Sequence, residues 1–252
     1  MLYRNLVLTG GNCRVGKSII KFAIQHNFKV FFSYCKNRKA AKKIHESYNR
    51  SKNISFQKLD LNKEISIKKF FHSAKKLGKI DFFINCASIK PKKKKFLKCN
   101  IKDFKKNTAV YNGFLLALKH ELNLIKNQKI PYPTKIINFS SRISFTGGKN
   151  LSHYAPMKAA INLITLILSK EHDGKKVTFN TICPGKIIKN YQHKRRRNKK
   201  MRKYITSEIL SKKIFYIYFN KNKLPFCTKK YRTDEWTQSR VPCPDSRWFR
   251  WK

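Results

Sequence analysis

The sequence predicts an α/β fold with a doubly wound parallel sheet and an atypical basic C-terminal tail. Short apolar runs alternate with helical patterns through residues 1–188, and strands that alternate with helices form parallel sheets. The first apolar run ends in a glycine turn that opens a helical pattern, an arrangement that directs backbone N–H groups toward a phosphate. A chain of 252 residues is long enough to form one such domain with a full core.

The first part of the chain supplies four of the expected strands. A run over residues 2–8 leads into the turn from Thr9 to Gly16, and the apolar residues between Ile19 and Ile24 then give a helix one buried face. Residues 80–85 are expected to be a strand buried on both faces, as in the centre of a parallel sheet. The remaining elements of this part are strands at 28–32 and 54–56 and helices at about 38–48 and 65–77.

The second part continues the same alternation. Residues 101–125 have the pattern of a long helix with an interruption near Gly113, because glycine disfavours a helix interior. A fifth strand is expected at 135–139, a helix at about 153–171 and a sixth strand at 177–182, closed by Cys183-Pro184-Gly185. The regular pattern stops after Ile188.

The fifth strand delivers Ser140-Ser141 at its carboxyl end, where open α/β sheets bind their ligands. Tyr154 and Lys158 follow with a spacing that puts both side chains on one helix face. An ammonium there favours the phenolate, and a phenol of pKa about 10 needs such help to exchange a proton near neutral pH. Ser141 could polarise a substrate oxygen that Tyr154 protonates. The structural alternative is a buried Tyr beside a solvated Lys.

Residues 1–188 resemble the short-chain dehydrogenase/reductase family, because five motifs occur in the family's order and spacing. The motifs are the turn from Thr9 to Gly16, Asp60 after the third strand, Asn85-Cys86-Ala87-Ser88 in place of N-N-A-G, Ser141 with Tyr154 and Lys158, and Pro184-Gly185. The resemblance implies a Rossmann-like dinucleotide-binding domain over residues 1–188 and a divergent basic tail over 189–252.

The resemblance also implies a role for each matching residue. Tyr154 would be the acid/base, Lys158 would lower its pKa and hold the nicotinamide ribose, and Ser141 would orient the reacting oxygen. Gly10 and Gly16 would admit the backbone to the pyrophosphate. The other implied cofactor contacts are Asp60 at the adenine, Asn85 and Ala87 beside the ribose, and Thr9, Val15, Pro184, Gly185 and Ile187.

Three positions depart from the family pattern. Arg14 replaces the middle glycine of the turn, as in the pteridine-reductase branch, and its guanidinium suits a phosphate. Val110 stands where a helical Asn usually completes the catalytic tetrad, unless Asn107 or Asn112 takes that place through a local shift. Lys189 stands where a Thr often follows Pro-Gly.

The segment after the second strand favours NADP(H) over NAD(H). NAD-selective sites usually carry an acidic residue there for the ribose 2′-OH, whereas residues 33–38 contain no carboxylate and two cations, Lys36 and Arg38. A 2′-phosphate would be stabilised by these cations and by Arg14. The alternative is that Lys36 and Arg38 belong to the general basic surplus.

Charge and cysteine content bound the partners. The net charge is +47, with 59 Lys and Arg against 12 Asp and Glu, but the excess is spread along the chain, so compositional drift is favoured over a dedicated nucleic-acid surface and only non-specific binding is expected. The seven cysteines show neither paired nor metal-ligand spacing, which predicts reduced thiols in the cytoplasm and no metal. The run from Ile214 to Phe219 is too short to span a membrane.

The tail admits two interpretations. Lys194 to Lys203 holds eight Lys or Arg in ten positions, which would suit an arm that binds polyanions. The favoured interpretation is a degenerated end that once encoded the substrate loop and last strand, so few apolar residues of 189–252 should pack against the body. If the tail instead hides a diverged strand, Ile214 to Phe219 is the candidate.

The leading functional hypothesis is an NADPH-dependent reductase of a small-molecule carbonyl, a 3-oxoacyl thioester or ketone, acting as a homo-oligomer. A pteridine-type reductase is the first alternative, favoured by Arg14 and by the Asn85-Cys86-Ala87-Ser88 variant. A hypothesis of another class is a catalytically inactive relic or polyanion-binding protein, motivated by Val110 and the unmatched tail.

Overall fold

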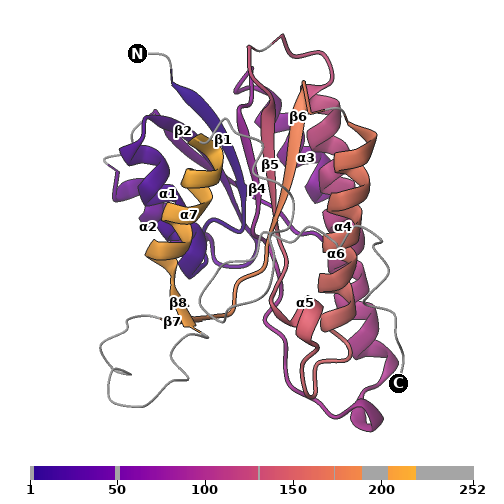
Figure 1. The fold of residues 1–252 in the computed structure, drawn as a ribbon. Helices are drawn as coiled ribbons and strands as arrows, with labels where there is room; N and C mark the ends of the chain where they lie inside the picture. Colours follow the sequence, from indigo (N-terminus) through magenta and orange to yellow (C-terminus); the bar gives the residue numbers. More distant parts are fainter. Residues whose placement is uncertain (1–2, 49–51, 130, 173, 189–203, 220–252) are drawn as a thin grey trace.

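The computed structural model describes residues 3–48, 52–129, 131–172, 174–188 and 204–219. Six parallel strands form the main sheet in the order β3-β2-β1-β4-β5-β6, which is the doubly wound topology expected from the sequence (Figure 1). Their bounds are β1 (Arg4–Thr9), β2 (Phe28–Tyr34), β3 (Ile54–Lys58), β4 (Phe82–Asn85), β5 (Thr134–Phe139) and β6 (Val177–Ile182). The prediction of six strands is therefore confirmed.

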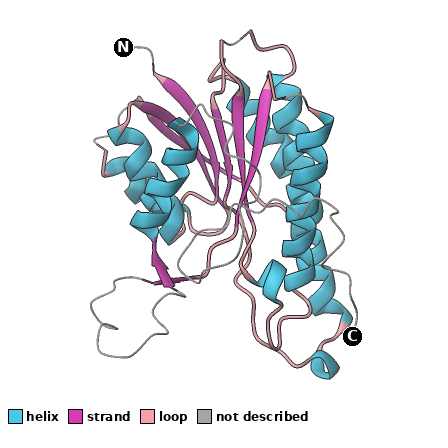
Figure 2. Cartoon of the chain, in the orientation of Figure 1, coloured by secondary structure: helices cyan, strands magenta, loops and turns pink. Residues whose placement is uncertain are grey.

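Helices cover both faces of this sheet (Figures 1 and 2). One face carries α1 (Arg14–Gln25), α2 (Arg38–Glu46) and α7 (Ser207–Phe219), and the other carries α3 (Glu64–Lys75), α4 (Ile101–Ile125) and α6 (Ala155–Glu171). The shorter elements are the 3-10 helix η1 (Phe96–Lys98), the helix α5 (Ile143–Thr146), and the strands β7 (Lys186–Ile188) and β8 (Tyr204–Thr206), which pair in parallel.

The central strands are buried on both faces because helices cover both. In β1, Leu6 and Leu8 pack into the core under α1, whereas Val7 packs into the core under α3 and α4. Phe82 and Phe83 divide in the same way in β4, and both are fully buried. Successive residues of these strands thus point into cores on opposite faces of the sheet. This explains why the strands are apolar throughout instead of alternating with polar residues.

Helix α4 differs from the expectation, since it runs unbroken from Ile101 to Ile125 through Gly113. A Cβ atom at Gly113 would collide with the backbone carbonyl of Leu61. The glycine therefore lets the helix approach the loop after β3 closely, and does not interrupt the helix.

The described part of the expected tail also differs. Tyr204–Thr206 pairs with β7, and Ser207–Phe219 is a helix packed on α1, with Leu210, Ile214 and Phe215 at most 1% exposed. The expectation that few apolar residues of this region pack against the body is wrong for residues 204–219, and Ile214 to Phe219 is helix rather than strand. Two segments of the expected tail lie outside the described residues: 189–203, which contains Lys189 and the basic block, and 220–252. The predicted division of the chain at residue 188 stays a prediction.

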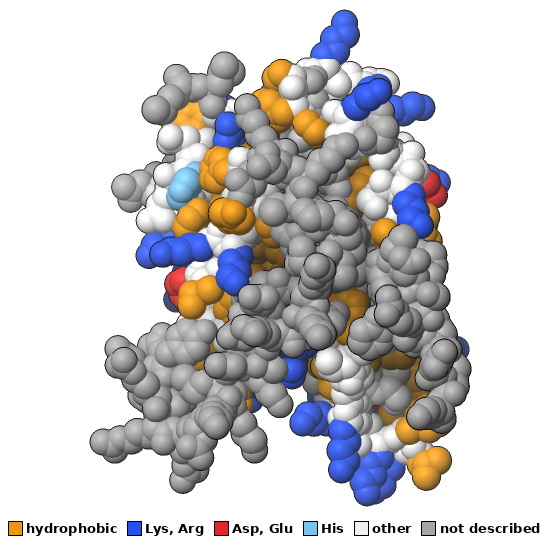
Figure 3. All heavy atoms as spheres, in the orientation of Figure 1, with side chains coloured by type: hydrophobic (Ala, Val, Ile, Leu, Met, Phe, Trp, Pro, Cys, Tyr) orange, Lys and Arg blue, Asp and Glu red, His pale blue; other side chains and the backbone are white. Residues whose placement is uncertain are grey.

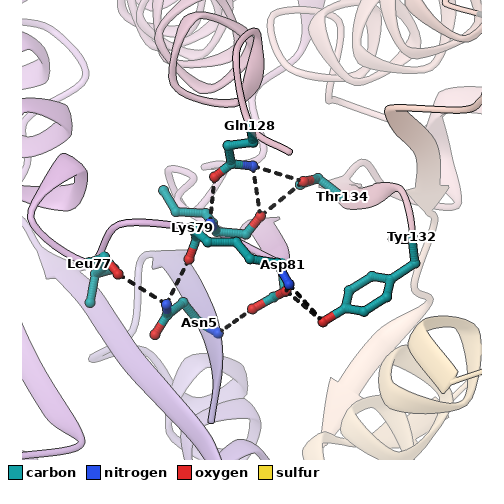
Figure 4. A network of polar contacts seen from close by, with 8 residues as sticks. Asn5, Leu77, Lys79, Asp81, Gln128, Tyr132 and Thr134 are labelled. Carbon is teal, nitrogen blue, oxygen red and sulfur yellow. Dashed lines mark hydrogen bonds and ion pairs between the residues drawn. The ribbon is translucent and has the colours of Figure 1, made fainter. Parts of the chain in front are cut away.

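A polar network connects the first residues of β1, β4 and β5 and the segments just before them (Figure 4). The buried Asp81 carboxylate accepts hydrogen bonds from the Asn5 backbone N–H at 2.7 Å and from the Tyr132 hydroxyl at 2.9 Å. Lys79 forms an ion pair with the same carboxylate at 3.3 Å. Gln128 and Thr134 bind the backbone of Ile80 beside it. The network fixes the edge opposite the one that carries the predicted site.

Basic side chains are dispersed over the surface. The face in Figure 3 shows Lys and Arg at its upper end, along its sides and at its lower end. The run Lys90 to Lys95 is a loop in which all but one of the lysines are exposed, as the sequence predicts for a solvated segment. Among the described residues, no helix combines the length and apolar character needed to cross a membrane.

Candidate active site

The predicted motifs lie in the loops that follow the strands, at the carboxyl edge of the sheet. Hydrogen bonds join these loops to the ends of neighbouring strands: the Gly10 N–H after β1 donates to the Ser33 Oγ in β2 at 2.8 Å, and the Ala87 N–H after β4 donates to the Thr9 Oγ1 in β1 at 3.1 Å. The loops after β5 and β6 are joined through the Arg142 N–H, which donates to the Pro184 carbonyl at 3.1 Å. The sheet thus gathers five motif segments along one edge.

The turn between β1 and α1 is closely packed around its glycines. Gly10 adopts φ +75°, a left-handed conformation that favours glycine, and a Cβ there would meet the backbone of Ala87. A Cβ at Gly16 would meet the Gly10 and Gly11 carbonyls, so α1 starts close against the turn. The Val15 side chain packs into the core, which leaves only its backbone at the turn.

Cys13 is the N-cap of α1, a feature that the sequence analysis missed. Its Sγ accepts a hydrogen bond from the Gly16 N–H at 3.3 Å. Ser, Thr, Asp and Asn are the usual N-cap residues, so the residue type gave little signal.

The cationic side chains that are expected to contact the cofactor are accessible to solvent. The Arg14, Lys36 and Arg38 side chains are exposed, and Asn37 between the last two caps α2 by accepting the Ala40 N–H at 2.9 Å. Asp60 follows β3, and hydrogen bonds from Asn62, chiefly from its backbone N–H, lower the pKa of its carboxyl.

Tyr154 and Lys158 lie together at the start of α6, beside the end of β5. Tyr154 lies immediately before α6, and the Lys158 N–H donates to its carbonyl at 3.3 Å, so the expected four-residue spacing closes the first helical turn. The buried Lys158 ammonium donates to the Phe139 carbonyl at 2.9 Å and lies 5.7 Å from the Tyr154 ring centroid. The Ser140 hydroxyl donates to the Lys158 carbonyl at 2.7 Å, which holds the Ser140-Ser141 turn against this helix.

The electrostatics of this pair differ from the sequence-based expectation. Burial raises the pKa of Tyr154, although a hydrogen bond with Ser88 acts in the opposite direction. Burial lowers the pKa of Lys158 to about 8. The net shift of the phenol pKa is therefore upward, opposite to the sequence-based expectation, because burial is its largest cause and the Lys158 ammonium donates its hydrogen bond to the Phe139 carbonyl rather than to Tyr154.

Helix α4 carries Val110, at the position where the family pattern has the tetrad Asn, and the two asparagines considered as substitutes. Val110 is half-buried, Asn112 is exposed, and Asn107 is buried and donates from its amide to the Asp103 carbonyl at 2.8 Å. Of the two asparagines considered as substitutes, only Asn107 lies on the inward side of the helix.

The loop after β6 gives the last predicted residues different surroundings. Pro184 is buried and Gly185 is half-buried. Ile187 pairs with Ile205 in the small sheet and packs against the α7 side of the core. Because part of the Ile187 side chain is buried there, the predicted cofactor contact of Ile187 would have to come from its backbone or from the exposed part of its side chain.

A buried carboxyl lies behind Asn85 and was not predicted. The Asn85 amide donates to Glu121 Oε2 and to Asn138 Oδ1, both at 3.0 Å, and the Asn138 amide donates to the Thr165 hydroxyl at 2.9 Å. Glu121 is completely buried, and burial raises its pKa to about 8. The network orients Asn85 at the end of β4 through a carboxyl whose pKa is raised by burial.

Replacing Glu121 with Gln is expected to remove part of the pH dependence of stability. A folded-state pKa of about 8, above the unfolded value near 4.5, means that the folded state holds its proton longer, so Glu121 lowers stability as pH rises through that window. Urea unfolding at pH 5 and pH 8 should show a smaller loss in the variant than in the unmodified chain. Glu171→Gln, at an exposed position of α6, is the control. Equal losses in the unmodified chain and the Glu121 variant would contradict a buried neutral acid.

A cavity of about 440 Å³ lies beside the Ser and Tyr motifs. It is lined by residues of the loop after β5, the start of α6 and η1, most of them apolar or glycine. The lining residues are Phe96, Ile143, Ser144, Gly147, Gly148, Asn150, Leu151, Ser152, Ala155, Pro156 and Ala159.

Comparison with known proteins places this geometry in a family. The model of the short chain dehydrogenase family matches residues 4–200. The chain is 24% identical over 196 residues to "Glucose and ribitol dehydrogenase homolog 2" of Arabidopsis thaliana, an alignment that covers 72% of this chain and 64% of that protein. It is 26% identical over 185 residues to the 3-oxoacyl-[acyl-carrier-protein] reductase FabG of Aquifex aeolicus, covering 72% of this chain and 73% of that protein.

Solved structures show the same fold. The structure of ElxO with NADP bound superposes with a TM-score of 0.75 at 21% identity, covering 89% of this chain and 94% of that chain. The family match spans most of the sequence. The chain therefore belongs to the short-chain dehydrogenase/reductase family of nicotinamide-dependent oxidoreductases.

Proposed function

We propose that the chain is an NADPH-dependent reductase of a small carbonyl compound, a 3-oxoacyl thioester or a ketone, with Ser141, Tyr154 and Lys158 at its centre. The observation that carries the proposal is the buried Lys158 ammonium beneath the Tyr154 ring at the end of β5. A phenol and an ammonium fixed together at the ligand-binding edge of a parallel sheet form a proton-transfer site.

The residues of the turn fit an anionic dinucleotide. The N-terminus of α1, of 12 residues, points its N–H groups at the turn, where the close packing of Gly10 and Gly16 admits no side chain. Arg14, Lys36 and Arg38 would meet the phosphates, Asp60 the adenine, and Asn85 with Ala87 the ribose. When bound, a reduced nicotinamide supplies the hydride.

The chain's own residues handle the proton. Because burial raises its pKa, Tyr154 is protonated at neutral pH, and its hydroxyl is the group that would donate a proton to the substrate oxygen. The Ser141 hydroxyl would donate a hydrogen bond to the same oxygen. Lys158 would stabilise the phenolate left behind, because an ammonium nearby favours that charge.

The substrate proposal rests on the cavity and on the relatives. The cavity beside Ser144 and Ala155 is mostly apolar, which suits a ketone or acyl chain. The FabG relative is named for 3-oxoacyl reduction, which supports the same class. The test is NADPH oxidation by the purified protein with an acetoacetyl thioester and with a dihydropterin. Turnover of the dihydropterin alone would replace the proposal with the pteridine-type alternative, which Arg14 favours.

NADPH is expected to bind at least tenfold more tightly than NADH, a difference of about 1.4 kcal/mol. The cause is the attraction of the 2′-phosphate to Arg14 with Lys36 or Arg38, at a segment that offers no carboxylate. Fluorescence titrations of both cofactors measure the ratio, and Arg14→Ala with Arg38→Ala should reduce it.

The matched control for this prediction is Lys21→Ala with Lys43→Ala, which removes two exposed charges farther along α1 and α2. A ratio that falls equally in both double variants would assign the preference to the overall charge. A ratio near one in the unmodified chain would withdraw the NADP assignment.

The second candidate function is an inactive relic that binds polyanions. Val110 at the expected tetrad position favours it, although Asn107 lies on the buried side of α4. Tight binding to random duplex DNA with strong salt dependence, and no NADPH signal in the titration, would support the relic.

A further inference from the structure

Two cysteines from distant segments meet at the glycine turn. Cys13 is the N-cap of α1 and Cys86 follows β4, and their Sγ atoms lie 3.9 Å apart. The segments are held together by the Ala87 N–H, which donates to the Thr9 hydroxyl at 3.1 Å. The two thiols therefore face each other across a contact that the fold itself maintains.

The two thiols have different surroundings. Cys13 is exposed and lies at the N-terminus of α1, where its Sγ accepts the Gly16 N–H at 3.3 Å. A hydrogen bond from Cys86 and those from the backbone lower the pKa of Cys13, whereas the same contact and burial raise the pKa of Cys86. Helix N-termini and hydrogen-bond donors favour thiolates, and the thiolate is the reactive form. Cys13 is thus the nucleophile of the pair, and Cys86 holds its proton.

We propose that Cys13 and Cys86 form an oxidative modification site, in which Cys13 reacts with a hydroperoxide and Cys86 then closes a disulfide across the glycine turn. No third His, Cys, Asp or Glu joins the pair to make a metal site within the part of the chain that the structure describes. An exposed thiolate with a second thiol beside it is the arrangement that peroxide-sensitive sites use.

The chemistry balances with hydrogen peroxide as the oxidant. The Cys13 thiolate attacks one peroxide oxygen, so an S–O bond forms, the O–O bond breaks, and the leaving hydroxide takes a proton to become water. The Cys86 thiol then loses its proton and attacks the Cys13 sulfur, so the S–S bond forms and the second oxygen leaves as water. Two thiols are oxidised by two electrons, and one peroxide is reduced to two waters.

The site bears on the cofactor, and this step rests on the proposed function. The Gly16 N–H that donates to Cys13 belongs to the helix end that would meet the pyrophosphate. A disulfide draws the two sulfur atoms together and so shifts that helix end against Cys86. Disulfide formation and cofactor binding should therefore oppose each other, and linkage requires that each weakens the other equally.

The first experiment is peptide mapping of the full chain after treatment with hydrogen peroxide, without reductant. A peptide pair joined through Cys13 and Cys86 should be the main product, and it should disappear in Cys13→Ser and in Cys86→Ser. In Cys86→Ser, dimedone should trap a sulfenic acid at Cys13. Cys35→Ser, at another exposed thiol near the same sheet edge, should leave the joined pair unchanged. Free Cys13 after treatment, or equal linkage through other cysteines, would overturn the proposal.

The second experiment separates this site from the proposed function. NADPH should slow disulfide formation at least tenfold, and the oxidised protein should bind NADPH at least tenfold more weakly until dithiothreitol restores it. If the disulfide forms in the first experiment but the reduced protein fails to bind NADPH, the modification site stands and the proposed function fails. If NADPH binds and the disulfide does not form, the reverse holds.

Discussion

Replacing Tyr154 with Phe is expected to lower NADPH-dependent reductase activity by roughly 10² to 10⁴ while NADPH affinity stays within about twofold. The substitution removes only the hydroxyl that would donate the proton, and leaves the ring in place above Lys158, 5.7 Å from its ammonium. Steady-state NADPH oxidation measures the first quantity, and fluorescence titration measures the second.

Tyr216→Phe provides the control, because it removes the hydroxyl of an exposed tyrosine on α7. Its activity should equal that of the unmodified chain. If Tyr154→Phe retained more than a tenth of the activity, Tyr154 would not be the acid. A variant that also lost NADPH affinity would point to a structural role for the hydroxyl.

Phe215→Ala is expected to lower the free energy of unfolding by about 3 to 5 kcal/mol. The ring is 1% exposed, and its centroid lies 4.9 Å from Phe22, 5.4 Å from Phe28 and 5.9 Å from Phe82. Its removal opens a cavity between α7, α1 and the sheet. A typical domain has only about 5 to 15 kcal/mol of stability, so urea unfolding should show a large shift of the midpoint.

Tyr216→Ala is the matched control. Tyr216 is next to Phe215 in the sequence but its side chain is 62% exposed, so its removal should lower the free energy of unfolding by less than about 0.5 kcal/mol. Similar costs for the two variants would contradict the packing of α7.

The same reasoning predicts that a chain ending at Ile188 fails to accumulate in folded form, because the partners of α7 on α1 and on the sheet would be exposed. A truncated chain that melts within a few degrees of the full chain would restore the dispensable-tail interpretation.

The sheet was predictable from the sequence because each strand is a short apolar run bounded by turn residues. Helix α7 was not predictable in the same way. Ile214 to Phe219 is apolar throughout, a pattern that fits a strand or a buried helix equally well. Its conformation is decided by α1, whose Ser18 lies 193 residues before its hydrogen-bond partner Ser211. Gly113 misled for a related reason, since its close neighbour Leu61 is distant in sequence.

The candidate site shows the same division. Motif spacing predicted that the glycine turn, Ser141, Tyr154 and Lys158 lie at one edge of the sheet, because these residues follow successive elements in a fixed order. Spacing could not show that Lys158 donates to the Phe139 carbonyl or that Cys13 meets Cys86, because both contacts depend on how the strands lie side by side. The buried Glu121 behind Asn85 was hidden for the same reason.

The packing of α7 against α1 has a consequence for how the chain emerges from the ribosome. Contacts between segments so far apart form late, since loop closure over that distance must come first. Phe28 and Phe82 are synthesised early, yet the ring that covers both belongs to Phe215. The nascent chain therefore carries an uncovered aromatic surface on its first strands until translation has passed α7, a period in which chaperone binding or aggregation competes with folding.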